Sequence, residues 1–487
     1  MPAKLLFANL LLAFWLVAAL AASAQTPDWH ATQTLPGYRA NCFFKESAVD
    51  ATGNVYLTGY FSGDVIFGDT TLHSTGELDG FVLKWDRARR RVAWVRQATG
   101  PGNEYVWQLV VQAPYVYVLG SFDWPPSAFG RPLRDSGRVE AYLARLTDHA
   151  THATIDWVQT LEDAQVPGGA RQLVVQGHSV YLANNTYALQ GPMYGSTPER
   201  GPTAGDIVAK FTDLGPAARF DWLYQQPAPA HNHAVMALAV QGRRVYLATT
   251  TWERYPLVLP PPGGRPQEAD GFGVHTRSVV ICLEDEGPTV RRRWQHPLTG
   301  QIFNLAASDH RLYVVGAIDE PNAFGDALVT TTNSNPKTDM FVARLEVADT
   351  TAHFRWVQRL GGPGYNGHTE MPLVAVRGRH VVVAGNFDSS QMAFGAHVLT
   401  NTNPTPRATA DMFVAHLTDA GATARFDWAQ RAGGPSIDGA SAVELHRRRV
   451  YFVGHFYYAP SAFGTHAVTI GFDRNGTPGW GWLRVGR

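Results

Sequence analysis

The residues best suited to chemistry are two histidines, His231 and His233, which flank Asn232. Residues two apart in a strand lie on the same face, so both imidazoles could reach one metal ion. His368 and Glu370 show the same spacing and could join them across the axis of the fold. Solvated loop histidines explain the same pattern in a chain with 18 histidines, and no four-ligand spacing stands out. We therefore predict no metal and no cofactor.

Carboxylates offer a second chemistry, because a pair of them can hydrolyse a glycosidic bond. No spacing identifies such a pair. One acid does recur at the start of a predicted strand, but a residue that recurs once per repeat is typical of a scaffold. There it would accept backbone N–H bonds in the preceding turn. These acids are Asp79, Glu140, Asp206, Asp339 and Asp411. The chain also lacks a Gly-x-Ser-x-Gly elbow, a His-Glu-x-x-His motif, a phosphate-binding loop and an EF-hand, so we assign no catalytic residue.

One stretch organises the chain. It runs from Asp50 to Phe61 and consists of a tight turn containing Gly53 and a β-branched, aromatic strand that starts at Val55. Seven versions of this strand follow one another at intervals of 61 to 69 residues, which predicts a repeat protein. The strands begin at Val55, Val116, Val180, Val245, Leu312, Val381 and Val450.

Each unit contains four predicted strands, A to D, without helical periodicity. In the first unit these are residues 47–50, 55–61, 79–86 and 92–97, with an aromatic-Gly pair between B and C and a Trp in D. One such sheet has two apolar faces that need covering, and seven arranged radially cover one another. We therefore predict an all-β fold, a seven-bladed β-propeller of four-stranded antiparallel blades over residues 25–487. A linear β solenoid is the alternative.

Two recurring residue types have structural interpretations. The Trp of strand D is expected to pack blade against blade rather than to form a sugar platform. Lys84 and its counterparts in strand C are expected to cover apolar surface with their stems while their charges reach water. An additional Trp29 precedes the first unit. Either the strand near Trp29 or the one from Trp480 to Val485 could close the ring.

The first unit, with Gly53 to Phe61, then Phe67-Gly68, then Asp79 to Lys84 and a Trp strand, resembles the bacterial SBBP-type β-propeller repeat. The resemblance extends from Trp29 to the C-terminus. It implies a secreted or envelope propeller, often without an assigned activity, and it brings no catalytic residues. Many exported relatives also bear a separate C-terminal sorting domain. We expect that domain to be absent here, because the sequence stops at Arg487, just past the last Trp strand.

The amino terminus predicts export. Lys4 precedes an apolar run over residues 5–22, and Ala22-Ser23-Ala24 fits the small-x-small cleavage rule, so residues 1–24 are expected to be a signal peptide. An uncleaved anchor helix is the alternative, because the run approaches membrane-spanning length. We expect a secreted, periplasmic or cell-surface protein without stable membrane insertion after cleavage.

Charge and cysteines limit the partners. With 41 basic and 41 acidic residues, the chain lacks the net basic face that nucleic acid requires, so no nucleic-acid partner is expected. Cys42 and Cys282 fall about half a ring apart, too far for a disulfide, so they should be free and mostly buried. We expect a monomer.

The candidate binding face follows from the strand order. A–B and C–D turns share one face, and the longer B–C and D–A connections share the other, with irregular B–C segments at 184–205 and 249–277. Variable loops on a rigid scaffold usually carry binding. The D–A loops should lie nearest the central channel. The residues predicted to bind there are Asn103, Glu104, Arg171, His231, His233, His296, Tyr365, Asn366, His368, Glu370 and Asp438.

Two functions remain open at this stage. The first is an exported, non-enzymatic module that binds a protein or a glycan, and it should show a broad exposed aromatic patch. The alternative is a polysaccharide hydrolase or lyase at the channel mouth, which should hold converging acids or histidines with shifted pKa values.

Overall fold

The computed structural model describes most of the chain. In some strands, among them residues 30–34, 253–259 and 267–275, only the backbone is described. The predicted signal peptide, residues 1–24, lies outside the described residues. The described residues are 27–34, 42–122, 127–133, 140–161, 172–185, 205–227, 233–259, 267–318, 322–329, 339–362, 372–401, 409–435, 437–456, 461–463, 466–468 and 477–484.

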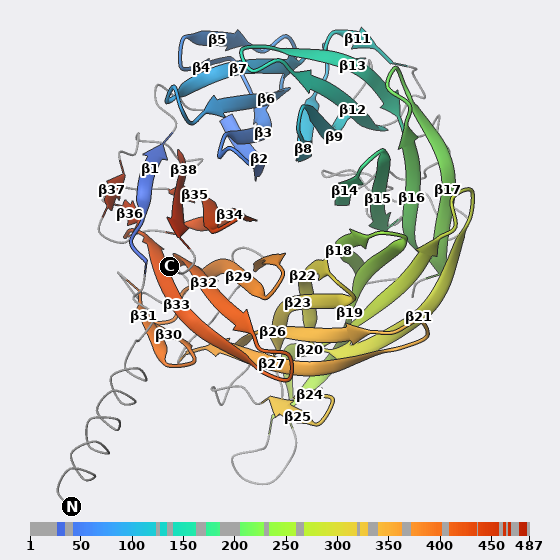
Figure 1. Ribbon diagram of the computed structural model, residues 1–487, viewed down its shortest axis with the longest axis vertical. Coiled ribbons are helices and arrows are strands. Elements are labelled where there is room, and N and C mark those ends of the chain that lie inside the picture. The colour runs from blue at the N-terminus through green and yellow to red at the C-terminus, as the bar shows by residue number, and fades with distance from the viewer. Residues whose placement is uncertain are drawn as a thin grey trace, which may run out of the picture.

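The strands form seven antiparallel blades around a common centre (Figure 1), which confirms the predicted seven-bladed β-propeller. Each blade is given below from its inner to its outer strand. The first four are β2 (Cys42–Val49), β3 (Val55–Phe61), β6 (Asp79–Asp86) and β7 (Arg91–Ala98); β8 (Glu104–Gln112), β9 (Tyr115–Phe122), β12 (Glu140–Asp148) and β13 (Ala153–Thr160); β14 (Gln172–Gln176), β15 (Ser179–Asn185), β16 (Gly205–Asp213) and β17 (Ala218–Pro227); and β18 (His233–Gln241), β19 (Arg244–Leu259), β20 (Gln267–Asp285) and β21 (Val290–Thr299).

The remaining three blades follow the same order. Blades 5 to 7 are β22 (Gln301–Ser308), β23 (Arg311–Ile318), β26 (Asp339–Val347) and β27 (Ala352–Gly361); β28 (Leu373–Arg377), β29 (His380–Phe387), β32 (Asp411–Asp419) and β33 (Ala424–Gly433); and β34 (Gly439–His446), β35 (Arg449–Phe456), β38 (Thr477–Arg484) and β1 (His30–Thr34).

The core lies between the blades. Every residue of β6 is buried, because both faces of this strand pack against a neighbouring blade, whereas β7 at the outer edge has exposed positions. Tyr56 and Trp94 of blade 1 share one apolar cluster with Val118 and Tyr142 of blade 2. Burying one such side chain is worth about 1.5–3 kcal/mol, so the blades stabilise one another, as the two-sided apolar pattern predicted.

Both chain ends build blade 7, which settles how the ring closes. β38 supplies strand C, and β1 pairs with it as strand D, with His30 opposite Trp482. The Trp29 segment is therefore the closing strand. Trp29 itself is not a register copy of the recurring Trp, because His30 occupies the position opposite strand C that Trp94 occupies in blade 1. Trp29 instead packs on Phe463, in a cluster shared with blade 6.

The aromatic-Gly pair belongs to a small hairpin between strands B and C. In blade 1 this is β4 (Asp64–Phe67) and β5 (Thr70–His73), with the Phe67 ring 4.9 Å from Phe81 and Gly68 in the turn at a φ of 62°. The corresponding hairpins are β10–β11 (Ser127–Ala128, Arg131–Pro132), β24–β25 (Asn322–Phe324, Ala327–Val329), β30–β31 (Gln391–Phe394, His397–Thr400) and β36–β37 (Ser461–Phe463, His466–Val468). β30 and β36 pair with β27 and β33 of the preceding blades, and so cover their outer edges.

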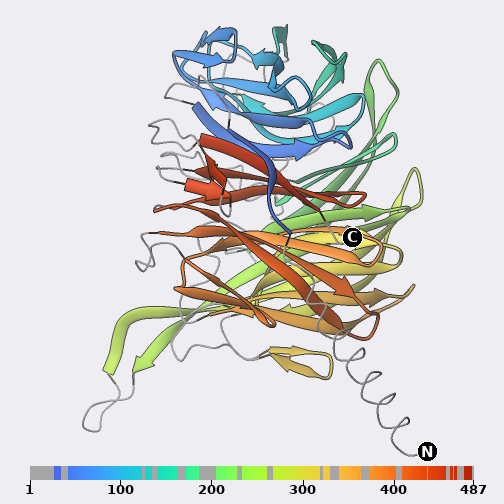
Figure 2. The ribbon, with the colours of Figure 1, turned by 60° about the vertical axis from the view of Figure 1, so that its left-hand side comes forward.

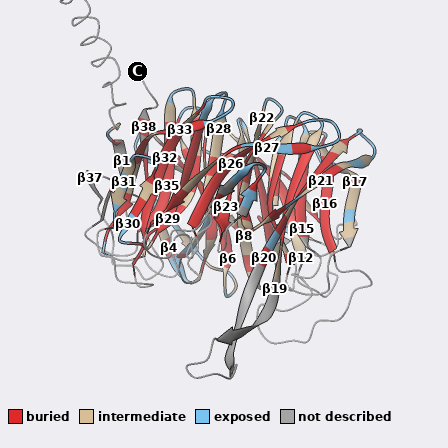
Figure 3. Ribbon diagram, turned by 90° about the horizontal axis from the view of Figure 1, so that it is seen from below, coloured by how far each residue is buried: buried red, intermediate tan, exposed pale blue. Residues whose placement is uncertain are grey.

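The two faces of the ring differ. Exposed tight turns line one face, and the β19–β20 hairpin projects from the other (Figures 2 and 3). The expected irregular segment 249–277 is therefore wrong for most of its length, because the two strands stay paired as far as Leu259 and Gln267. The other predicted irregular segment, 184–205, lies largely outside the described residues.

Within the described residues, no helix has the length and apolarity needed to cross a membrane. Cys42 and Cys282 are buried and form no disulfide, as predicted.

Candidate functional site

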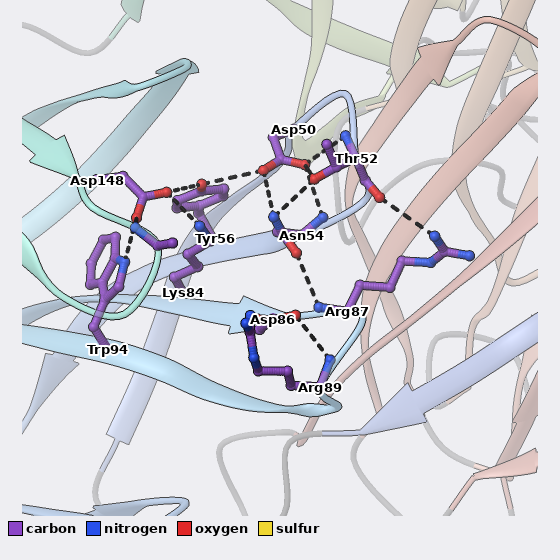
Figure 4. A network of polar contacts seen from close by, with 11 residues as sticks. Asp50, Thr52, Asn54, Tyr56, Lys84, Asp86, Arg87, Arg89, Trp94 and Asp148 are labelled. Carbon is purple, nitrogen blue, oxygen red and sulfur yellow. Dashed lines mark hydrogen bonds and ion pairs between the residues drawn. The ribbon is translucent and has the colours of Figure 1, made fainter.

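Most of the recurring polar residues serve the joints between blades. Asp148 of blade 2 accepts hydrogen bonds from three side chains of blade 1: Tyr56 Oη at 2.7 Å, Lys84 Nζ at 2.5 Å and Trp94 Nε1 at 2.9 Å (Figure 4). Burial alone would raise the pKa of Asp148, but these three donors outweigh it and lower the pKa below its ordinary value. The carboxylate is thus a buried, ionised clamp.

The same clamp recurs at three further joints. In each, one Asp of the following blade pairs with a basic residue of strand C and accepts a hydrogen bond from a Tyr of strand B. The sets are Asp213 with Arg145 and Tyr117, Asp285 with Lys210 and Tyr181, and Asp419 with Arg344 and Tyr313.

One prediction about these residues is wrong. Lys84 was expected to carry its charge into water, yet it is only 5% exposed. Its partner lies 64 positions ahead in the next blade, where no local sequence pattern reveals it.

The joint between blades 4 and 5 has lost both members of the clamp. Cys282 occupies the basic position and Val347 the position of the Asp, and the two residues lie in one apolar cluster. A more exposed ion pair, Arg244 with Asp349, joins the same two blades instead. The basic residue and the Asp are expected to be lost together, because either charged residue alone would be buried without its counterion.

Among the recurring acids at the start of strand C, Asp79 accepts a backbone N–H bond in the preceding turn, as predicted, whereas Asp411 pairs with a side chain of strand D. The Oδ2 atom of Asp79 accepts a hydrogen bond from the Thr75 backbone N–H at 3.1 Å and one from the Gln97 amide of strand D. Asp411 binds Arg431 of strand D at 2.8 Å. Asp50 accepts bonds from Thr52 and Asn54 within its own turn (Figure 4).

The structure describes five of the residues predicted to bind, and it disperses them over different blades. Asn103 and Glu104 lie where the chain enters blade 2, and Glu104 is fully buried. His233 begins β18, with its Nε2 3.5 Å from Asp206. Asp438 is also fully buried and accepts the Gly434 backbone N–H at 2.6 Å.

The predicted position of His296 in a D–A loop is wrong. This residue lies within the outer strand β21, with its ring 5.3 Å from Phe354, because strand D extends beyond its Trp. The other predicted residues lie outside the described part of the chain; they are Arg171, His231, Tyr365, Asn366, His368 and Glu370. In the described ranges, no three His, Cys, Asp or Glu side chains are grouped so as to hold a metal.

A different group of side chains forms the candidate site. Four rings, Phe43, Tyr60, Tyr105 and Trp107, gather with Lys45 between blades 1 and 2; we call these five residues the aromatic patch. Their ring centroids lie 5.1 Å apart for Phe43 and Tyr60, 4.9 Å for Tyr60 and Tyr105, and 4.8 Å for Tyr105 and Trp107. Phe43 is 38% exposed and the other three rings are partly exposed. The patch meets the expectation for a binding module only in part, because its rings lie on three strands of two blades rather than over several loops, and only Phe43 among these rings is more than partly exposed.

Strand topology places the aromatic patch beside the axis on the B–C and D–A face. Strands β2 and β8 are innermost, and both begin at this face, while Tyr60 lies near the end of β3, just before the B–C connection. Asn103 and Glu104, two of the predicted residues, directly precede Tyr105. The aromatic patch thus lies on the same face as the predicted residues Asn103 and Glu104, but none of its own five residues was predicted.

Two β-bulges position the ends of the aromatic patch. The register shifts at Lys45 in β2 and at Trp107 in β8, so each strand holds one extra residue there. A bulge turns the extra side chain away from the regular alternation, which places both residues over Tyr60. The Lys45 ammonium lies 5.2 Å from the Tyr60 ring centroid and 5.5 Å from that of Trp107.

Two carboxyl groups close to the aromatic patch have raised pKa values. Burial raises the pKa of Glu46 to about 8, assisted by the charge of Glu444. Burial also raises the pKa of Glu444, on β34 of blade 7, to about 7. His455 has the opposite shift, because burial and the charge of Lys45 lower its pKa to about 4.

These shifts predict a pH dependence of stability. Above about pH 4.5 the unfolded chain ionises both carboxyls, while the folded protein keeps Glu444 protonated up to about pH 7 and Glu46 up to about pH 8, so the unfolding free energy falls as pH rises through this range. Since water partly reaches both groups, we expect the Glu46→Gln, Glu444→Gln double variant to reduce this fall by about 1–2 kcal/mol in urea unfolding at pH 5 and pH 8. The exposed Glu77→Gln is the control. An unchanged slope in the double variant would contradict the assignment.

A hollow of about 510 Å³ lies between blades 3 and 4 on the opposite face. Its charged groups are already paired, Lys210 with Asp285 and Arg219 with Asp221. It is the outer end of a blade joint, and we assign no ligand to it.

Comparison with known proteins does not identify a family for this chain. No family model and no curated protein matches the chain. Among solved structures the chain is similar to the Phage phi92 endosialidase, with a TM-score of 0.39 and 10% sequence identity over 95% of this chain and 70% of that chain. The resemblance to SBBP-type repeats therefore stays a prediction.

Proposed function

We propose that the protein is an exported, non-enzymatic propeller that binds carbohydrate at the aromatic patch. The observation that carries the proposal is the row of partly exposed rings, from Phe43 through Tyr60 to Tyr105 and Trp107, on the innermost strands β2 and β8 and on β3 beside them. The C–H face of a pyranose ring is apolar, so it gains contact area on such rings without leaving its hydroxyls unsatisfied. The rigid blades hold the rings in place before the ligand arrives, which reduces the entropic cost of binding.

The test compares two tryptophans on the same face. Trp107→Ala removes the end of the aromatic patch, and Trp252→Ala removes another partly buried Trp, on β19 of blade 4. On a glycan array, followed by calorimetry with a retained glycan, we expect Trp107→Ala to weaken binding about tenfold or more and Trp252→Ala to leave it unchanged. Equal binding by wild type and Trp107→Ala, or no retained glycan, would overturn the proposal.

A polysaccharide hydrolase is the second candidate, because Glu46 and Glu444 interact through their charges and both have raised pKa values. A carboxyl that keeps its proton near neutral pH is what a general acid requires. Release of reducing ends from a bound glycan, abolished in Glu46→Gln or Glu444→Gln with binding intact, would favour this candidate over binding alone.

A further inference from the structure

We propose that the carbohydrate bound at the aromatic patch is acidic, and that Lys45 is the residue that recognises its anionic group. This inference rests on the proposed function and adds the class of ligand. An aromatic surface alone would select for sugar rings of any charge, whereas Lys45 would add a preference for acidic sugars.

The position of Lys45 is the first argument. Its side chain is exposed, and its ammonium lies over the rings of Tyr60 and Trp107 at 5.2 and 5.5 Å. A sugar stacked on these rings would present the substituents at its rim to the ammonium. An anionic substituent there would form a charge-assisted contact, while a neutral substituent would leave the ammonium partly desolvated without compensation.

The charge of Lys45 is also uncompensated. Among the described residues, no ion pair involves Lys45, whereas every basic residue of the four blade clamps has an acidic partner. The neighbouring carboxyl Glu46 does not neutralise it, because Glu46 keeps its proton at neutral pH. Lys45 is exposed as a residue, but partial burial of its ammonium against the rings lowers its pKa, and an anionic ligand would raise that pKa again.

The backbone supports a dedicated role for this residue. Lys45 is the extra residue of a β-bulge in β2, and the corresponding bulge of β34 carries Ser441 and that of β18 carries Met236. The bulge recurs from blade to blade as a feature of the scaffold, but of these three only the one in β2 presents a cation. Two sources could supply the anion, a carboxylate or a sulfate ester, and the chemistry that Lys45 requires is common to both.

The experiment uses matched glycan pairs on the full mature chain. One pair is oligogalacturonate and its neutral methyl ester, and the other is a sulfated oligosaccharide and its desulfated form. The proteins are wild type, Lys45→Met, which keeps the stem without the charge, and Lys45→Arg, which keeps the charge. Trp107→Ala serves as the variant with a damaged ring surface.

We expect wild type to bind the acidic member of at least one pair about tenfold more tightly than the neutral member. Lys45→Met should lose this preference while keeping the affinity for the neutral member, and Lys45→Arg should retain it. A preference in the first pair identifies a carboxylate and one in the second a sulfate.

Equal binding of acidic and neutral members by wild type, with loss in Trp107→Ala, would overturn this inference and leave carbohydrate binding intact. A preference for acidic members that survives in Lys45→Met would also overturn it. Failure of every glycan to bind wild type would overturn the proposed function itself, and this inference with it.

Discussion

Replacing Asp148 with valine is expected to lower the unfolding free energy by about 3–5 kcal/mol. The reason is the charge left behind, since the Lys84 ammonium is buried at this joint and would lose the carboxylate that lies 2.5 Å away. Tyr56 and Trp94 would lose the same acceptor. Urea unfolding of the single variant at pH 7 measures the effect.

Another joint of the same protein shows which substitutions make a suitable control for this variant. The joint between blades 4 and 5 carries Cys282 and Val347 in place of the buried ion pair. The double variant Lys84→Cys, Asp148→Val copies that joint into blades 1 and 2, and we expect it to recover most of the loss, because no buried charge remains unpaired. A double variant that is less stable than Asp148→Val would contradict the interpretation of Cys282 and Val347 as a compensated pair.

Replacing Trp29 with alanine is expected to cost about 3–5 kcal/mol. Trp29 is 1% exposed, its ring lies 4.8 Å from Phe463, and it anchors β1, the strand that closes blade 7. Removing it leaves a cavity at the seam that joins the two ends of the chain. Trp107→Ala is the comparison, since Trp107 is partly exposed and outside the closing blade, and it should cost far less.

Urea unfolding of both tryptophan variants, monitored by far-UV circular dichroism, gives the two losses. A midpoint for Trp29→Ala equal to that of wild type would show that β1 does not stabilise the ring. A larger loss in Trp107→Ala than in Trp29→Ala would show that the aromatic patch is part of the core rather than a surface for ligand.

The fold could be predicted because the same constraints act seven times. Each unit repeats a strand that starts with an apolar residue such as Val55 or Val116, and the two-sided apolar pattern requires neighbours on both faces. The closure could not be predicted, because the segments of Trp29 and Trp480 both contribute strands to one blade, as D and C. Their order depends on pairing between the chain ends, which no local pattern encodes.

The site was harder to predict because it departs from the repeat. The residues predicted to bind, such as His231 and Asp438, were chosen as polar residues of loops, because catalysis and metal binding need such side chains. The aromatic patch instead lies on strands. One signal was available: Trp107 is in strand A, while the recurring tryptophans such as Trp94 and Trp222 are in strand D. The clamps were missed for another reason, since Lys84 and Asp148 come together only when the blades do.

The most direct test of the central claim is a crystal structure of residues 25–487 with a glycan that the array retains. We expect a sugar ring stacked on Tyr60, Tyr105 or Trp107, with an anionic group against the Lys45 ammonium. A glycan seated on the opposite face, among the tight A–B and C–D turns, or one that leaves these rings bare, would contradict it.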